Sequence, residues 1–132
     1  MLKEIEFTMD AGQDAGKEFK ITALPAVQMD RWLTRLLGCF ASQDLTIADI
    51  ANMNFAQLSN SIYKIESQEE KQELFDELLA SCSLKKEGIY IPMKGDNINS
   101  FVDDWQTLFR LKEKALALNL GFFEDGEEST SS

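Results

Sequence analysis

The chain contains no histidine and only two cysteines, two prolines and seven glycines among its 132 residues. Without histidine it lacks the most common general base and both the Ser-His-Asp and the Cys-His catalytic sets. Its glycines form neither a GxGxxG nor a GxxxxGK[ST] phosphate-binding loop. The sequence therefore predicts a protein that is not an enzyme and needs no cofactor.

The two cysteines, Cys39 and Cys82, lie far apart and form no CxxC pair. A zinc site is not expected, because no histidine is present to complete one. Both cysteines are expected to be small core residues in a reducing compartment. The polar residues 96–99 do not match a calcium-binding EF-hand loop, because Ile98 stands where the second oxygen ligand is needed. No metal site is predicted.

Long apolar runs are also missing. No stretch approaches the roughly 18 apolar residues of a membrane span, and the N-terminus lacks the basic start and apolar core of a signal peptide. A soluble, cytoplasmic protein without membrane contact is therefore expected.

Acidic residues dominate the charge, with 23 acidic against 13 basic residues and a net charge of -10. The last residues hold four of these acids, at positions 124, 125, 127 and 128, so the rest of the chain still carries -6. An acidic body without gathered lysines repels a phosphate backbone. Direct binding to nucleic acid is therefore not expected.

Apolar and polar residues alternate in two short runs near the N-terminus, with Ile5 and Phe7 in the first and Phe19 and Ile21 in the second. Alternation with a period of two predicts half-buried strands. The glycines and aspartates of residues 10–16 are typical of a turn. Residues 3–22 are thus expected to form an antiparallel hairpin, whose aspartates serve the turn and bind no metal.

Pro25 suits the first position of a helix, which is predicted to run to about residue 41. Arg31 and Arg35 are expected to be solvated on one side of this helix. The opposite, core-facing side is predicted to consist of Met29, Leu33, Leu36, Leu37 and Phe40.

Three later segments begin with the spacing of a capping box, at residues 46–49, 67–70 and 100–103. The first helix is expected to break near residues 52–54, and the second to extend its apolar face to Cys82. The third is predicted to run from Phe101 to Gly121, which is a natural helix stop. A short edge strand is expected at residues 89–91, because Pro92 argues against a central one.

The predicted fold class is mainly α, in an α+β arrangement: an N-terminal β-hairpin followed by a bundle of about four to five helices. Residues 1–123 are expected to form a single globular domain, with the hairpin at 3–22 and the helical part at 25–121. Residues 124–132 contain no apolar side chain and are expected to be a disordered tail of acidic residues and serines.

The last predicted helix has apolar residues in more than one row: positions 101, 108 and 115, positions 105, 109, 116 and 120, and positions 111 and 118. Either this is a central helix wrapped by the others, or one of its faces also meets a partner. The candidate partner-binding residues are Phe101, Trp105, Leu108, Phe122 and Phe123.

Two end segments carry a family resemblance: FKITALPA at residues 19–26, and WQTLFRL at 105–111 leading to LNLGFF at 118–123. Together they resemble the tail assembly chaperones of long-tailed bacteriophages and related prophages. Between the two segments the similarity is one of length and helix order. Both motifs are packing motifs and include no catalytic residue.

The resemblance implies a non-catalytic protein of the host bacterial cytoplasm that binds the tape measure protein, recruits tail tube subunits and is absent from the mature virion. Such genes often give two products by a programmed frameshift, and this chain resembles the shorter one. The longer product would carry the contact to the major tail tube protein. Homo-oligomers are compatible with this role.

Two other functions stay open at this stage. One is an acidic helical adaptor, and the other is an inhibitor that mimics nucleic acid by presenting rows of carboxylates. The acids at positions 66, 69, 70, 73, 76 and 77 fit such a row, but they equally fit the solvated face of an amphipathic helix.

Overall fold

The first two strands, β1 (Glu4–Thr8) and β2 (Glu18–Thr22), pair in an antiparallel hairpin. Ile5 lies opposite Ile21 and Phe7 opposite Phe19, so the apolar side chains share one face of the sheet. The predicted hairpin is therefore present. The computed structural model describes residues 2–40 and 43–120, so the acidic tail expected at 124–132 lies outside the described residues.

Four helices follow the hairpin: α1 (Ala26–Cys39), α2 (Ile47–Asn52), α3 (Phe55–Tyr63) and α4 (Gln68–Leu79). The side chains of Thr46, Asn54 and Ser67 each accept a hydrogen bond from a backbone N–H three residues later and so begin α2, α3 and α4. The break expected near residues 52–54 is confirmed, because Met53 is extended and Asn54 starts a new helix.

Helix α4 is followed by a second hairpin, formed by β3 (Cys82–Lys86) and β4 (Ile89–Pro92). Strand β3 pairs with β2, which gives one antiparallel sheet in the order β1-β2-β3-β4 and leaves β4 at an edge, as expected. The assignment of Cys82 to the preceding helix was wrong. It lies four residues after Leu78 and so fits a helical face, yet Cys82 and Leu84 also alternate with Ser83 and Lys85 as a strand requires.

The last part of the chain contains a short 3₁₀ turn, η2 (Gly95–Asn97), and the helices α5 (Ile98–Phe101) and α6 (Trp105–Leu120). The prediction of one helix starting at Phe101 was wrong, because Val102 is extended and separates α5 from α6. The predicted stop at Gly121 lies outside the described residues.

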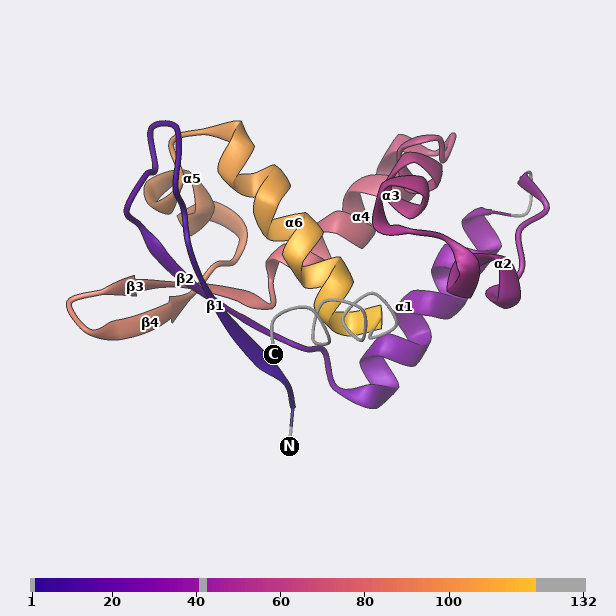
Figure 1. Cartoon of the computed structure of the whole chain (residues 1–132), viewed down its shortest axis with the longest axis horizontal. Coiled ribbons are helices and arrows are strands. Elements are labelled where there is room, and N and C mark those ends of the chain that lie inside the picture. The colour runs from indigo at the N-terminus through magenta and orange to yellow at the C-terminus, as the bar shows by residue number, and fades with distance from the viewer. Residues whose placement is uncertain (1, 41–42, 121–132) are drawn as a thin grey trace.

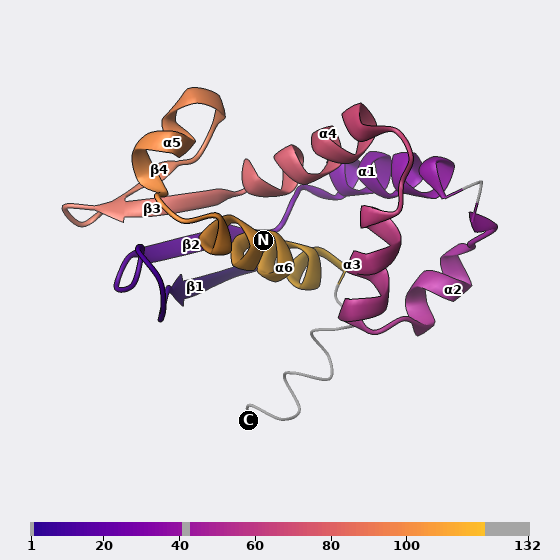
Figure 2. The same cartoon turned by 90° about the horizontal axis from the view of Figure 1, so that it is seen from above.

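Helix α6 lies between the sheet and helices α1–α4 (Figure 1). Figure 2 shows the same arrangement from above, with the strands and α5 on one side of α6 and helices α1–α4 on the other. Its side chains Leu111, Ala115 and Leu118 belong to the same buried core as Phe19 and Ile21 of β2. The two parts of the fold therefore share one hydrophobic core through α6.

Helices α1 and α4 are joined by a buried tryptophan and a half-buried ion-pair group. The indole N–H of Trp32 donates a hydrogen bond to the carbonyl oxygen of Leu74 at 3.0 Å. Arg35 lies within 3.5–3.6 Å of the carboxylates of three glutamates on α4, namely Glu70, Glu73 and Glu77. The expectation of a solvated Arg35 was therefore wrong, because the facing helix carries these acids.

The cysteines lie where the sequence predicted them, in or against the core. Cys82 is fully buried on β3, and burial raises the pKa of its thiol to about 12. Cys39 is half-buried on α1, and burial together with the nearby Glu70 raises its pKa as well. Both thiols therefore stay protonated at neutral pH, which disfavours nucleophilic chemistry. No helix among the described residues is both long and apolar enough to cross a membrane.

Candidate functional site

Helix α6 is covered along most of its length. Beyond its first turn every residue up to Leu120 is buried or half-buried, whereas Trp105 and Gln106 are exposed. This arrangement supports the interpretation of α6 as a central helix. One row of α6 runs from the surface into the core: Trp105, Phe109, Lys112 and Leu116 follow each other at intervals of four, three and four residues and so share one side of the helix. Trp105 is exposed, Phe109 and Lys112 are half-buried, and Leu116 is buried.

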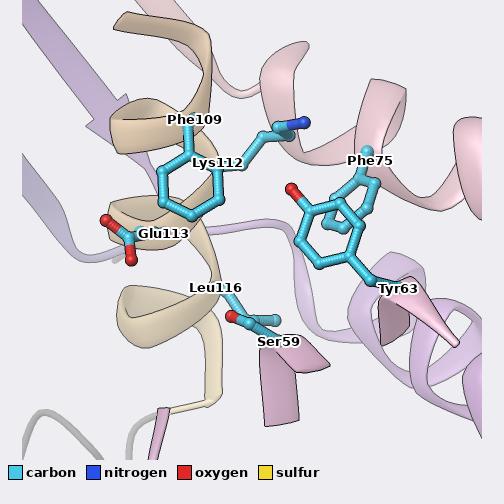
Figure 3. A pocket seen from close by; sticks show the side chains of 7 residues that line it. All are labelled: Ser59, Tyr63, Phe75, Phe109, Lys112, Glu113 and Leu116. Atoms are coloured by element: carbon cyan, nitrogen blue, oxygen red, sulfur yellow. The ribbon is translucent and has the colours of Figure 1, made fainter. Parts of the chain in front are cut away.

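A small hollow lies beside this row, where α6 meets α3 and α4 (Figure 3). Its volume is about 10 Å³, which is roughly the room of one water molecule. It is lined by Ser59 and Tyr63 of α3, Phe75 of α4, and Phe109, Lys112, Glu113 and Leu116 of α6. The hollow is too small for a cofactor, but its rim is a place where a partner side chain can rest.

Three aromatic rings from three different helices form the hollow. The ring of Tyr63 lies 5.1 Å from that of Phe75 and 6.4 Å from that of Phe109, between ring centroids. Phe75 and Leu116 are buried and form the floor, whereas Tyr63 is 40% exposed and stands at the rim. Exposed aromatic side chains over a buried apolar floor are typical of protein interfaces.

Lys112 gives this region its charge. Its ammonium nitrogen lies 4.4 Å from the ring centroid of Phe75 and 5.8 Å from that of Tyr63. Burial lowers the pKa of Lys112, and the negative charge of Asp76 only partly offsets this effect. Burial and the charge of Glu113 in turn raise the pKa of the Tyr63 hydroxyl. A half-buried cation over two rings is thus held by cation–π attraction.

Several polar groups at the hollow have no partner within the described part of the chain. The side chains of Ser59, Tyr63, Lys112 and Glu113 form no hydrogen bond or ion pair with another described residue. In Figure 3 the Tyr63 hydroxyl points toward α6, while Glu113 points away from the aromatic rings. The hydroxyls of Ser59 and Tyr63 are therefore available to a partner that covers the rings, whereas Glu113 points elsewhere and Lys112 already faces two rings.

We name this region the aromatic surface and define it as Trp105, Phe109 and Lys112 of α6 with Tyr63 of α3 and Phe75 of α4. Trp105 has the most exposed aromatic side chain of the five, at 71%. It stands one helical turn before Phe109 on the same side of α6. The aromatic surface thus runs from the first turn of α6 to the hollow.

The candidate partner-binding residues differ in how exposed they are. Of these, Trp105 is exposed, Leu108 is half-buried against the core, and Phe101 is only 6% exposed within it. Phe122 and Phe123 lie outside the described residues. Sequence reasoning did not select Tyr63, whose position beside α6 depends on how α3 packs. The sequence pattern did place positions 105, 109 and 116 in one helical row, and this row was the signal from which Phe109 could have been selected.

A buried carboxylate fixes the start of α6, and with it Trp105. Asp14, in the loop of the first hairpin, is 0% exposed. It accepts hydrogen bonds from the backbone N–H groups of Asp103 and Asp104, each at 3.0 Å, and from the hydroxyl of Thr107 at 2.6 Å. It therefore satisfies N–H groups at the helix start and does more than serve its own turn, which corrects the expectation for this aspartate.

Lys17 completes this arrangement. Its ammonium donates to Asp14 at 2.7 Å and to the carbonyl oxygen of Phe101 at 2.9 Å, and so ties the hairpin to the end of α5. Burial alone raises the pKa of Asp14, but the hydrogen bonds from Lys17, Thr107 and Asp103 outweigh it and lower the pKa to about 2. The carboxylate is therefore ionised at any pH near neutrality.

Gly12 closes the same contact from the hairpin side. Its φ is +76°, and a methyl group there would collide with the Asp104 carboxylate, which accepts a hydrogen bond from the Gln13 N–H at 3.1 Å. We expect Gly12→Ala to lower the free energy of unfolding by about 2 kcal/mol, through backbone strain and the lost contact. Urea denaturation measures this loss.

Gly16 is the matched control for this substitution, because it has φ +93° but no atom within 4 Å of an added methyl group. Gly16→Ala is expected to cost about 1 kcal/mol from strain alone. Equal losses for the two variants would show that the Asp104 contact contributes nothing.

The acidic row proposed for mimicry is partly engaged within the fold. Three of its six members, Glu70, Glu73 and Glu77, surround Arg35 of α1. The distances of 3.5–3.6 Å are those of charge contacts and are longer than good hydrogen bonds. A nucleic-acid mimic needs its carboxylates free, so this packing does not favour that function.

The described residues contain no group of three or more His, Cys, Asp or Glu side chains that could hold a metal ion. No family model, curated protein or solved structure matches this chain. What the geometry offers is a binding surface: exposed aromatic rings, a shallow hollow, and polar groups that have no partner among the residues the structure describes.

Proposed function

We propose that this chain is a tail assembly chaperone that binds helical segments of a tape measure protein through the aromatic surface. The observation that carries the proposal is the exposed Trp105 in line with the ring cluster of Tyr63, Phe75 and Phe109. The resemblance of residues 19–26 and of residues 105–111 with 118–123 to that family supports it. The assignment of function rests on both together.

The shape of the aromatic surface suits a helical partner. An amphipathic helix places apolar anchors at intervals of three, four and seven residues on one face, and the rings of Trp105 and Phe109, one turn apart on α6, offer such a stripe a surface to pack on. A tape measure protein is long and largely helical, so it offers such anchors repeatedly. Its apolar stripe would be shielded from water while the tail is built.

The shallowness of the hollow suits many weak contacts better than one tight one. A site of about 10 Å³ admits no large anchor side chain, so a single copy is expected to bind weakly. Many copies along one polymer still give high occupancy, because binding to a shared chain is multivalent. Coating of the tape measure protein by many copies follows from this arrangement.

The remaining parts of the proposed role follow from the family resemblance alone. They are a non-catalytic action in the host bacterial cytoplasm, recruitment of the major tail tube protein by a longer frameshift product, and absence from the mature virion. The aromatic surface does not involve residues 121–132, where the longer product would diverge. Binding to the tape measure protein is therefore expected of both products.

Co-expression tests the proposal. The tape measure protein of the same phage or prophage is expected to stay soluble when produced with this chain and to precipitate when produced alone. Ile89→Ser is the matched control for substitutions in the aromatic surface, because Ile89 is apolar and 66% exposed but lies on β4, outside that surface. If the tape measure protein precipitates equally with and without this chain, the chaperone function is wrong.

A further inference from the structure

The two edges of the sheet differ in how well they are protected. Strand β4 has four residues, ends at Pro92, and follows a tight turn at Glu87 and Gly88 with φ values of 51° and 82°. Proline and short length are common ways of blocking an edge strand. Strand β1 has five residues, Glu4–Thr8, and neither a proline nor a bulge. Of the two edges formed by the described strands, the β1 edge is therefore the one whose backbone is not blocked.

The hydrogen-bond pattern shows which groups of β1 are available. The N–H of Met9 donates to Lys17, and the carbonyl oxygen of Lys3 accepts from Ala23. In an antiparallel pair such residues alternate with ones that face away, so Glu4, Glu6 and Thr8 direct their N–H and C=O groups outward. Since β1 ends the strand order, no described strand pairs with these groups.

The two sides of this edge carry opposite charges. On the open face of the sheet β1 exposes Glu4, Glu6 and Thr8. Glu4 lies 3.9 Å from the Lys20 ammonium, and Glu6 accepts a hydrogen bond from the Tyr90 hydroxyl at 3.0 Å, and both carboxylates remain exposed. On the covered face the half-buried Phe7 lies under two cations of α6, with Arg110 at 5.2 Å and Lys114 at 5.5 Å from its ring centroid. A strand added here meets acidic groups on one side, and an aromatic ring with basic groups on the other.

From these observations we propose that the β1 edge binds an extended segment of a partner protein by strand addition. The segment has basic side chains on the side facing Glu4 and Glu6, and apolar or acidic ones on the side facing Phe7, as charge complementarity requires. This interaction is independent of the aromatic surface and of its helical ligand.

A second copy of this chain does not fit the same edge. Antiparallel pairing of β1 with its own copy places Glu4 opposite Glu6 when centred on Ile5, and Glu6 opposite Glu6 when centred on Glu6; only a register shifted to Phe7, which leaves Glu4 outside the paired strand, avoids this. Like charges directly opposite each other destabilise a strand pair. The charge pattern therefore selects a different, basic segment.

The test uses a labelled peptide of three Lys-Val repeats as the probe, with a peptide of three Lys followed by three Val as its control. The alternating peptide is expected to bind at least tenfold more tightly, measured by fluorescence anisotropy at moderate salt. Amide hydrogen exchange at Glu4, Glu6 and Thr8 is expected to slow only with this peptide. Equal binding of both peptides would mean that the acidic protein attracts any basic peptide, and it would overturn the proposal.

Two substitutions of Glu6 distinguish the contribution of its backbone N–H to peptide binding from that of its charge. Glu6→Pro removes an outward N–H without breaking the bond ladder to β2, and is expected to weaken binding at least tenfold. Glu6→Gln keeps the N–H and is expected to weaken it less than about fivefold.

Thr8→Pro repeats the backbone test at a position without charge, so a folding defect in one variant does not decide the result. Unchanged binding in both folded proline variants would overturn the proposal. So would a dimer in sedimentation that Glu6→Pro dissociates, since a second copy would then occupy the edge.

Discussion

Asp14→Ala is expected to lower the free energy of unfolding by about 3 kcal/mol, measured by urea denaturation at pH 7. The substitution leaves the N–H groups of Asp103 and Asp104 and the hydroxyl of Thr107 without their acceptor. It also leaves the Lys17 ammonium without its closest carboxylate. Because Asp14 is fully buried, water does not replace these bonds without rearrangement of the loop.

Asp10→Ala is the matched control, because Asp10 lies in the same loop but its side chain is 72% exposed. Its single contact, to Arg110 at 3.5 Å, is a surface ion pair that contributes little. A change within about 0.5 kcal/mol is expected. If Asp14→Ala costs no more than Asp10→Ala, the buried carboxylate does not hold α6 to the hairpin.

The same carboxylate gives the fold a dependence on acid. The pKa of Asp14 is about 2 in the folded chain against 3.8 ordinarily, so its contribution is fully present above about pH 4. As the pH falls from 4 toward 2, the unfolded chain binds the proton first, and about 2 kcal/mol of stability is lost. Asp14→Ala should lack this part of the acid-induced loss in denaturation curves recorded between pH 5 and pH 2.

Local patterns were sufficient for the elements that local chemistry determines. The alternation around Phe7 and Phe19 predicted the first hairpin, and side-chain caps at Thr46 and Ser67 predicted the starts of α2 and α4. Pro25 was predicted as the first residue of a helix and lies one residue before α1, as its N-cap with a ψ of 150°. Each of these signals acts between residues that are close in the sequence and are therefore also close in space.

The errors came from contacts between distant parts of the chain. Strand β3 is a strand because it pairs with β2, some 60 residues earlier, and its short pattern also fitted the end of a helix. At the start of α6 the Asp104 carboxylate caps the helix locally by accepting the N–H of Gln106 at 3.0 Å. The residues just before the helix are held by Asp14, about 90 residues away, which accepts the N–H groups of Asp103 and Asp104. No spacing rule within the sequence reveals such a partner.

The aromatic surface shows the same division. The row containing Trp105 and Phe109 was visible as a helical period on a single element. The placement of Tyr63 and Phe75 beside that row depends on the packing of α3 and α4 against α6. Trp105 and Phe109 could thus be predicted as one row, whereas the contributions of α3 and α4, which make it a surface of several helices, could not.

Removing the two exposed rings of the aromatic surface is expected to abolish binding to the tape measure protein. Interface aromatic residues often contribute about 2 kcal/mol each, so Trp105→Ala should weaken binding about thirtyfold, and the double variant with Tyr63→Ala at least a hundredfold. Isothermal titration with a soluble helical fragment of the tape measure protein measures both effects.

Stability separates this outcome from a folding defect. Trp105 is 71% exposed, so Trp105→Ala should change the free energy of unfolding by less than about 0.5 kcal/mol. Tyr63→Ala should cost about 1 kcal/mol, because its ring packs on Phe75 at 5.1 Å. Val27→Ala provides the control for an exposed apolar residue elsewhere, on α1 and 65% exposed. If Trp105→Ala and Val27→Ala bind the fragment equally well, the tape measure protein does not use the aromatic surface, because the most exposed ring of that surface would then contribute nothing to recognition.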